Sequence, residues 1–232
     1  MSVPHRFSSG DRRQQILEIA TGMFAEKGFA ATTTREIAAR AQVNEALIFR
    51  HFPTKDELYW AVLETKILSD NRQLQLQELL AAPGDVRSAL TAVAEWMLRR
   101  HAQDPTTIRL SLFCGLEHHD LSQRLFEQFA ASYFEALADY LRQQMRRGVL
   151  RTLDPLMTAR SFVGAVVYHS LLRELFNSVD SVRNLDAGGT SKLVVSIWLD
   201  GMSATGTQGE ADHPAEDQAR NTAILLETTQ GS

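Results

Sequence analysis

Apolar side chains recur along this chain at intervals of three and four residues, the spacing of one face of an α-helix. Strict alternation of apolar and polar positions, which marks β-strands, is scarce, and all six prolines lie near a chain end or a break in the helical pattern. The pattern therefore predicts an all-α fold. The predicted helices are residues 11–27, two short helices within 28–58, and then 54–80, 85–101, 106–116, 121–147, 155–177 and 191–202.

These helices divide the chain into two parts with no flexible linker between them. Residues 9–54 hold three helices, and residues 55–203 hold six, of which the first follows directly behind the third helix of the chain. Residues 1–8 are expected to be flexible. Residues 204–232 are rich in Ser, Thr, Gly, Gln and Glu and favour a disordered tail. A further short helix over 223–227 is compatible with the pattern.

The two short helices carry clear start signals. Thr33 and Glu36 have the spacing of a capping box, in which each side chain bonds the other residue's backbone amide. Asn44 is a good N-cap for the second helix. In that helix Ile48 and Phe52 share one side, so the opposite side is left outside the core. A two-turn helix with a thin apolar anchor and an unburied outer face suits insertion into a DNA major groove.

Residues 28–58, GFAATTTREIAARAQVNEALIFRHFPTKDEL, resemble the DNA-binding helix-turn-helix of the TetR family of transcriptional regulators. Residues 37–43 resemble the family's second helix and turn, and residues 47–52 followed by Lys55 resemble its recognition helix and the start of its fourth helix. The resemblance implies an N-terminal three-helix DNA-binding domain followed by a six-helix ligand-binding and dimerisation domain.

Three residues depart from the family's usual pattern. Gln42 stands where the family usually has a glycine at the turn, and Phe49 replaces a tyrosine, which removes one hydroxyl donor to phosphate. Glu45 stands where the family often has a small or basic residue. These departures concern individual DNA contacts rather than the fold.

The candidate DNA contacts fall into phosphate contacts and base readers. Arg35 is a phosphate contact or, as arginine often is, a reader of guanine. Phe49 packs against the sugar-phosphate backbone or turns inward as core. The candidate DNA-binding residues are Thr33, Thr34, Arg35, Asn44, Glu45, Ala46, Leu47, Phe49, Arg50, His51 and Lys55.

Charge limits the DNA hypothesis without excluding it. The formal net charge is −4, and residues 1–60 hold eight lysines and arginines against seven aspartates and glutamates. Affinity must therefore come from a few placed cations and helix N-termini rather than from a broad positive field. The single cysteine, Cys114, excludes an intramolecular disulfide, and no signal peptide or membrane-length apolar run is evident, so a cytoplasmic protein is expected with no membrane partner.

The last two predicted helices, 155–177 and 191–202, are apolar around most of their circumference. Only six helices are predicted beyond residues 9–54, too few to bury both apolar helices completely. A homodimer through these two helices is therefore expected, with Val195 and Trp198 at the interface. The TetR resemblance implies the same dimer bundle, which would supply the two-fold symmetry that paired half-sites require.

Aromatic and sulfur-containing side chains gather on the predicted helices between residues 85 and 177. Residue by residue, ordinary core packing is the better explanation for them. That some of them line a pocket for an apolar or aromatic effector is mainly what the TetR resemblance implies. No lysine or arginine is among these candidates to pair with a multiply charged ligand. The candidate ligand-binding residues are Trp96, Met97, Phe113, Phe126, Tyr133, Tyr168 and His169.

Other chemistries have little support in the sequence. Cys114, Glu117, His118 and His119 do not have the spacing of a metal-ligand set, and no cofactor motif or catalytic triad motif is present, so no metal, cofactor or enzymatic activity is expected. The leading hypothesis is a ligand-responsive transcriptional repressor that binds a palindromic operator as a dimer. The alternatives are an activator, or a helical small-molecule-binding or enzymatic protein that has lost specific DNA binding.

Overall fold

The computed structural model of the chain describes residues 9–68, 71–176, 178–180 and 186–202, and within these ranges every regular element is a helix. The predicted all-α fold is confirmed. The predictions for residues 1–8, for the tail over 204–232 and for a short helix at 223–227 lie outside the described residues. The elements are α1 (Ser9–Lys27), α2 (Thr34–Arg40), α3 (Glu45–His51), α4 (Lys55–Leu63), η1 (Glu64–Leu68), α5 (Arg72–Ala81), α6 (Val86–Gln103), α7 (Thr106–Glu117), α8 (His119–Leu125), η2 (Phe126–Ala130), α9 (Ala131–Arg146), α10 (Pro155–Leu175) and α12 (Ala187–Met202).

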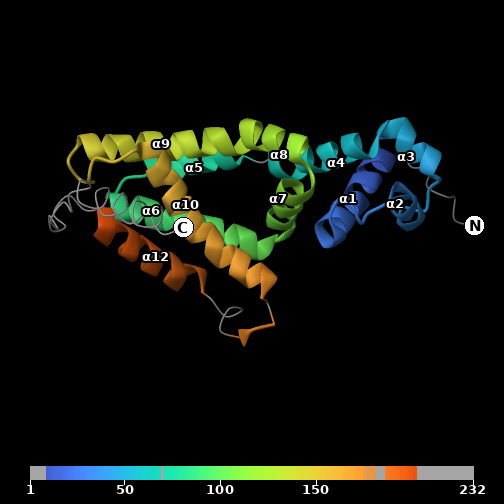
Figure 1. The fold of residues 1–232 in the computed structure, drawn as a ribbon. Helices are drawn as coiled ribbons and strands as arrows, with labels where there is room; N and C mark the ends of the chain where they lie inside the picture. The colour runs from blue at the N-terminus through green and yellow to red at the C-terminus, as the bar shows by residue number, and fades with distance from the viewer. Residues whose placement is uncertain (1–8, 69–70, 177, 181–185, 203–232) are drawn as a thin grey trace, which may run out of the picture.

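Helices α1 to α4 form the head at one end of an elongated molecule (Figure 1). Their apolar stripes meet in one buried core, which includes Phe24, Ile37 and Ile48. Leu110 and Cys114 from α7 belong to the same core, as does Leu125 from α8. The head is therefore not closed by its own helices, and its core runs across the domain boundary expected after residue 54.

The trunk has a second core, formed by α5, α6, α9, α10 and α12. Figure 1 shows α5 and α9 running along one edge, α6 and α12 along the opposite edge, and α10 crossing between them. Val195, expected at the dimer interface, is instead fully buried within the subunit, and the Trp198 ring packs edge-on against Phe162 at 5.4 Å between centroids. The helix that carries them uses this side for its own subunit's core.

The helix predicted over residues 54–80 is interrupted in the structure. Helix α4 ends at Leu63, the π-helical segment η1 follows, and α5 begins only at Arg72. The guanidinium of Arg72 donates a hydrogen bond to the Lys66 carbonyl oxygen at 3.1 Å. This side chain thus takes the place of the backbone amide that would bond this carbonyl in a continuous helix. The polar turn expected at residues 118–120 is also wrong, because α8 begins one residue after His118.

The turn between α2 and α3 has a helix-ending geometry that normally requires glycine. The amide of Gln42 bonds the Ala39 carbonyl at 3.2 Å and the amide of Val43 bonds the Ala38 carbonyl at 3.0 Å, which is the Schellman arrangement. Gln42 has a φ of 54°, the only positive φ of a non-glycine residue in the described part of the chain. This residue therefore holds the recognition helix in position at a steric cost.

We expect Gln42→Gly to raise the free energy of unfolding by about 0.5–1 kcal/mol, because glycine adopts positive φ without a clashing Cβ. Urea unfolding followed by circular dichroism at one protein concentration measures the change. The matched control Ala39→Gly, on the exposed side of α2, should instead lower stability by up to about 1 kcal/mol. A loss of stability in Gln42→Gly would contradict this account of the turn.

Candidate nucleic-acid interface and effector cavity

The start of α2 is held by the predicted capping box. The Glu36 amide donates to the Thr33 hydroxyl at 3.2 Å, and the Thr33 amide donates to the Glu36 carboxylate at 3.0 Å. The hydrogen bonds from Thr33 keep the pKa of Glu36 below its ordinary value. This negative charge lies at the positive end of the α2 dipole, so it stabilises the helix but also weakens the local attraction for phosphate.

Helix α3 is positioned by one cap and one anchor. The Asn44 side-chain oxygen accepts from the Leu47 amide at 2.8 Å, and Ile48 is fully buried in the head core. The Thr34 hydroxyl donates to the Glu45 carboxylate at 2.5 Å, which ties the first turn of α3 to the first turn of α2. Two predicted DNA contacts, Thr34 and Glu45, thus bind each other in the absence of DNA.

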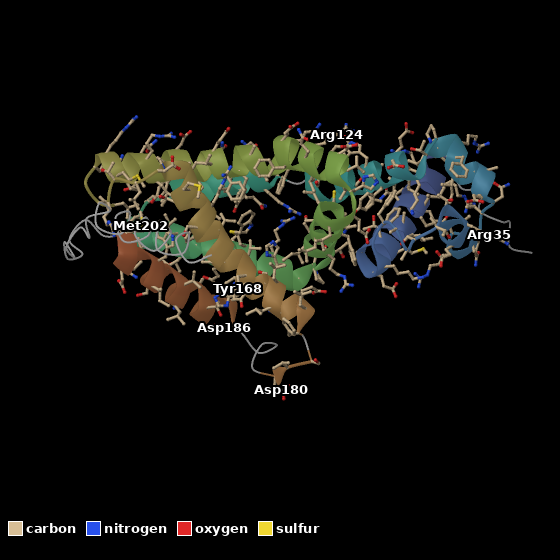
Figure 2. The ribbon with its side chains drawn as sticks, in the orientation of Figure 1. Arg35, Arg124, Tyr168, Asp180, Asp186 and Met202 are labelled. Carbon is tan, nitrogen blue, oxygen red and sulfur yellow. The ribbon has the colours of Figure 1, made fainter. Side chains whose placement is uncertain are left out.

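The outer face of these two helices carries exposed side chains. Arg35 lies at the outer end of the head (Figure 2), and Ala46 and Arg50 are exposed on α3. Neither arginine forms an ion pair with a described residue. Phe49 is 43% exposed, so its ring faces outward and not into the core. These are the positions from which side chains can reach bases and phosphates.

The remaining predicted contacts lie deeper. Leu47 and His51 are half-buried, and the buried His51 Nε2 has no hydrogen-bond partner among the described residues. The Lys55 ammonium lies 4.1 Å from the centroid of the Phe29 ring, and burial lowers the pKa of this lysine. Any phosphate contact by Lys55 must therefore be made from a position that is already packed on an aromatic ring.

Two partly open cavities of the trunk lie beside the C-terminal half of α6. The aromatic cavity, of about 140 Å³, lies between α5, α6, η2, α9 and α10 and is lined by Arg72, Trp96, Met97, Arg100, His101, Phe129, Ala130, Tyr133, Phe134, Val163 and Val167. The junction cavity, of about 230 Å³, lies between α6, α7, α10 and α12 and is lined by Leu98, His101, Ala102, Pro105, Ile108, His169, Ser170, Arg173, Glu174, Ala187 and Thr190. His101 belongs to both.

Four of the seven candidate ligand-binding residues line one of these two cavities. Trp96, Met97 and Tyr133 line the aromatic cavity, and His169 lines the junction cavity. The other three lie outside both walls. Phe126 and Tyr168 are exposed, Tyr168 on the outside of α10 (Figure 2), and Phe113 lies beside Gly28 at the contact between head and trunk.

Three polar residues of the aromatic cavity were not anticipated from the sequence. Arg72 and Arg100 bring positive charge to the wall of this cavity, whereas the candidate ligand-binding residues included no lysine or arginine. Burial, aided by the charges of Arg72 and Arg100, lowers the pKa of His101 to about 4, so this histidine is neutral at pH 7. Its Nδ1 lies 2.9 Å from the Ser170 hydroxyl. Helical periodicity identifies such residues only as polar positions, because it does not reveal which side chains of other helices they meet.

The residues considered for a metal have other partners. Cys114 is buried in the head core, Glu117 accepts from backbone amides, and His118 lies 2.9 Å from the Asp56 carboxylate. No group of three metal-binding side chains occurs among the described residues. In the same part of the chain, no helix combines the length and the apolar character that crossing a membrane requires.

Comparison with known proteins assigns both halves of the chain. Residues 16–62 match the family described as bacterial regulatory proteins of the tetR family, and residues 88–199 match the C-terminal domain of AefR-like transcriptional repressors. The HTH-type transcriptional regulator YvkB of Bacillus subtilis is 32% identical over 60% of this chain and 70% of its own length. The chain belongs to the TetR family.

Other relatives of this TetR-family regulator match shorter stretches or the fold alone. The HTH-type transcriptional repressor Rv3405c of Mycobacterium tuberculosis is 51% identical over 31% of this chain and 36% of that protein, so the chain spans about a third of the length of such relatives. The Bacillus subtilis regulator FadR in complex with stearoyl-CoA has a TM-score of 0.66 at 18% identity, covering 84% of this chain and 99% of FadR. FadR from Bacillus halodurans has a TM-score of 0.65 at 18% identity, covering 81% and 98%.

In this TetR-family chain the head is joined to the trunk by backbone groups at the end of α1. Arg109 of α7 donates from Nε to the Ala25 carbonyl at 2.5 Å and from Nη2 to the Glu26 carbonyl at 3.3 Å. Its Nη1 forms an ion pair with Glu174 of α10 at 2.6 Å. The last carbonyls of a helix lack intrahelical partners, so a trunk arginine supplies the cap of a head helix.

The turn that follows α1 is held from the same trunk helix. The Glu117 carboxylate accepts from the amides of Phe29 at 2.6 Å and of Ala30 at 3.0 Å. Gly28, with a φ of 82°, makes this approach possible, because a Cβ there would lie 2.5 Å from the Glu117 oxygen. The Phe29 ring also meets the His118 ring edge-on at 4.4 Å. Helix α7 therefore satisfies both carbonyl and amide groups of the head.

We expect Arg109→Met to lower the free energy of unfolding by about 1–3 kcal/mol and to speed amide hydrogen exchange at the end of α1, because charge-assisted hydrogen bonds are lost and Glu174 keeps a buried charge. Urea unfolding and hydrogen exchange with mass spectrometry measure the two effects. The control is Arg99→Met, which removes an exposed pair with Glu95 on α6 and should change stability by less than about 0.5 kcal/mol. Equal effects of the two substitutions would contradict the special role of Arg109.

Proposed function

We propose that this TetR-family protein is a transcriptional repressor that binds a palindromic operator as a homodimer and is released from it by a small-molecule effector. One observation carries the proposal: a helix-turn-helix head with an exposed recognition face is bonded directly to a trunk that contains partly open cavities. The family establishes DNA-binding transcriptional regulation. The operator symmetry, the dimer and the effector are the parts proposed here.

Repression is favoured over activation by the names of related proteins, although both roles occur among them. The C-terminal match is to AefR-like repressors, and SCO4008 of Streptomyces coelicolor, 26% identical over 62% of this chain, is named a repressor. FasR of Mycolicibacterium smegmatis, 35% identical over 39% of this chain, is named an activator. A reporter assay with and without the gene decides the sign of regulation once an operator is known.

The proposed DNA contacts follow from exposure. Arg35 and Arg50 supply charge, and Ala46 and Phe49 supply apolar contact. Thr34 and Glu45 can take part only if the hydrogen bond between them rearranges or is retained as a support for α3. Glu45 also places a negative charge near the phosphates, so binding depends strongly on a few arginines.

Effector control is proposed to act through α7. Glu174, the ion-pair partner of Arg109, lines the junction cavity, and so does Ile108, the residue before Arg109. A ligand that displaces α7 or α10 would move the groups that hold the end of α1. The effector can shift the protein between two head positions only by binding one of them more tightly, and DNA and effector affinities are then coupled reciprocally.

The operator test is selection of bound sequences from a random DNA pool, followed by mobility shifts at several salt concentrations. A palindromic consensus and a salt-dependent shift are expected. Arg35→Ala should weaken binding by about fivefold to tenfold and reduce the salt slope by about 0.9 if Arg35 contacts phosphate. If Arg35 reads guanine, the preference at one base position is also lost.

Arg142→Ala is the control for this test, because Arg142 lies on α9 in the trunk and pairs with Asp139 on the same helix. It should leave affinity and salt slope unchanged. Failure to recover any consensus would instead support a helical small-molecule-binding or enzymatic protein without specific DNA binding.

The dimer is proposed to use the outer sides of α10 and α12. Large apolar side chains stand exposed there although they lie on otherwise well-packed helices. The exposed apolar residues of this surface are Met157, Tyr168, Leu175, Leu193 and Ile197. A second copy of the chain would cover them and would place two heads for two half-sites of an operator.

We expect Leu193→Asp and Ile197→Asp each to weaken the dimer roughly a hundredfold, since an uncompensated charge buried at an interface costs about 3 kcal/mol. Both residues are more than 60% exposed in the subunit, at 62% and 66%, so the subunit fold should survive. Sedimentation velocity over a concentration series measures the association, and circular dichroism checks the fold. Lys192→Asp, a neighbouring exposed polar position, is the control. An undiminished dimer in both aspartate variants would place the interface elsewhere.

A further inference from the structure

The first turn of the recognition helix carries a carboxylate that the protein holds in one position. Glu45 is the first residue of α3, and its Oε1 accepts a hydrogen bond at 2.5 Å from the hydroxyl of Thr34, the first residue of α2. Both side chains are half-buried. A long side chain loses rotamer freedom when it forms a contact, and here that loss has already occurred in the free protein. The carboxylate of Glu45 is therefore preorganised before DNA is bound.

Helix α3 has other supports, so this hydrogen bond is not its only constraint. The Asn44 side chain accepts from the Leu47 amide at 2.8 Å, and Ile48 is fully buried in the head core. The Val43 amide bonds the Ala38 carbonyl at 3.0 Å, which holds the turn before α3. The bond between the first turns of α2 and α3 adds the direction of one carboxylate to this set.

The carboxylate of Glu45 keeps acceptor sites that are not used within the described part of the chain. A carboxylate has about four lone-pair sites on its two oxygens, and the Thr34 hydroxyl occupies one of them. The other carboxylate of these two helices, Glu36, differs, because it accepts from the Thr33 amide at 3.0 Å and pairs with Lys27 at 3.4 Å. Glu45 can therefore accept a hydrogen bond from a donor outside the chain without releasing Thr34.

The position of Glu45 and the chemistry of the major groove indicate which donor this is. The N-terminal residues of a recognition helix contact base edges, and Ala46 next to Glu45 is exposed. In the major groove only cytosine and adenine present an amino group to a carboxylate. Adenine also presents the N7 acceptor beside its amino group, and this lone pair would face the carboxylate, whereas cytosine has no acceptor there. The chemistry therefore favours cytosine.

We propose that Glu45 is a specificity residue that accepts a hydrogen bond from the amino group of an operator cytosine, and that Thr34 is the positioning residue that directs its carboxylate. This inference rests on the proposed function, because it concerns the operator that the head recognises. The same carboxylate repels phosphate, so Glu45 lowers affinity for DNA in general while it raises the preference for one base.

The test is selection from a random DNA pool with the wild type and with Glu45→Gln, followed by competition mobility shifts with all four bases at each consensus position. The wild type should prefer cytosine about tenfold at one position for each bound head. Glutamine still accepts from Thr34 through its oxygen, but its amide group donates, so Glu45→Gln should lose the cytosine preference and favour a base that presents an acceptor. Its affinity for unrelated DNA should rise about twofold or more, because a negative charge near the phosphates is removed.

Two substitutions of Thr34 test its positioning role. Thr34→Val removes the hydroxyl but keeps the shape of the side chain, so it should reduce the cytosine preference from about tenfold to about threefold or less. Thr34→Ser keeps a donor and should retain the preference. Glu26→Gln is the control for loss of charge, since it removes an exposed carboxylate at the end of α1, outside the two recognition helices, and should leave every base preference unchanged.

The selection separates this inference from the proposed function. If Glu45→Gln recovers the wild-type consensus with its cytosine preference intact, the inference is wrong and DNA-binding regulation stands. A Glu45→Gln variant that binds all sequences more weakly, with unchanged preferences and a lower melting temperature, would make Glu45 only a support for α3 and also overturn it. Full cytosine preference in Thr34→Val would remove the positioning role of Thr34. If the wild type itself recovers no consensus, the proposed function fails and this inference fails with it.

Discussion

The unpaired backbone groups at the end of α1 are the constraint on which the arrangement of the two halves depends. A helix end leaves carbonyls without partners, and the turn after it leaves amides. Here one trunk helix satisfies both kinds, with Arg109 on the carbonyls of Ala25 and Glu26 and Glu117 on the amides of Phe29 and Ala30. Because these bonds are directional and mutually supporting, the head and α7 are held in one relative orientation.

This constraint bears on how a ligand bound in the trunk would change the position of the head. A continuous helix over residues 54–80 would be a stiff lever behind the recognition helix, but η1 interrupts it at Glu64–Leu68. Helix α7 offers a shorter connection, since it contributes Leu110 and Cys114 to the head core and Ile108 to the wall of the junction cavity. The ion pair between Arg109 and Glu174 extends the connection to α10, whose outer side is proposed for the dimer.

The proposed DNA-binding face shows how a protein of net negative charge could bind DNA. Its carboxylates are largely engaged in supporting the two short helices, Glu36 in the capping box and Glu45 with Thr34. The negative charge of these carboxylates is therefore partly offset by their hydrogen-bond donors, and it opposes the exposed arginines less. The proposed dimer would double the number of such contacts, so a few cations per subunit would be sufficient.

The sequence by itself determined the helical class, the helix-turn-helix and the caps, because these depend on residues within four positions of one another. Thr33 with Glu36 and Asn44 with Leu47 belong to this local set. The tertiary structure alone decided which side of an apolar helix faces its own core. Val195 is buried while Leu193 and Ile197 are exposed, although all three are apolar and lie within five residues. It also brought Arg109 to Ala25, a contact between helices distant in sequence. Periodicity specifies the direction of a side chain on its helix, but the neighbour it meets depends on how the helices pack.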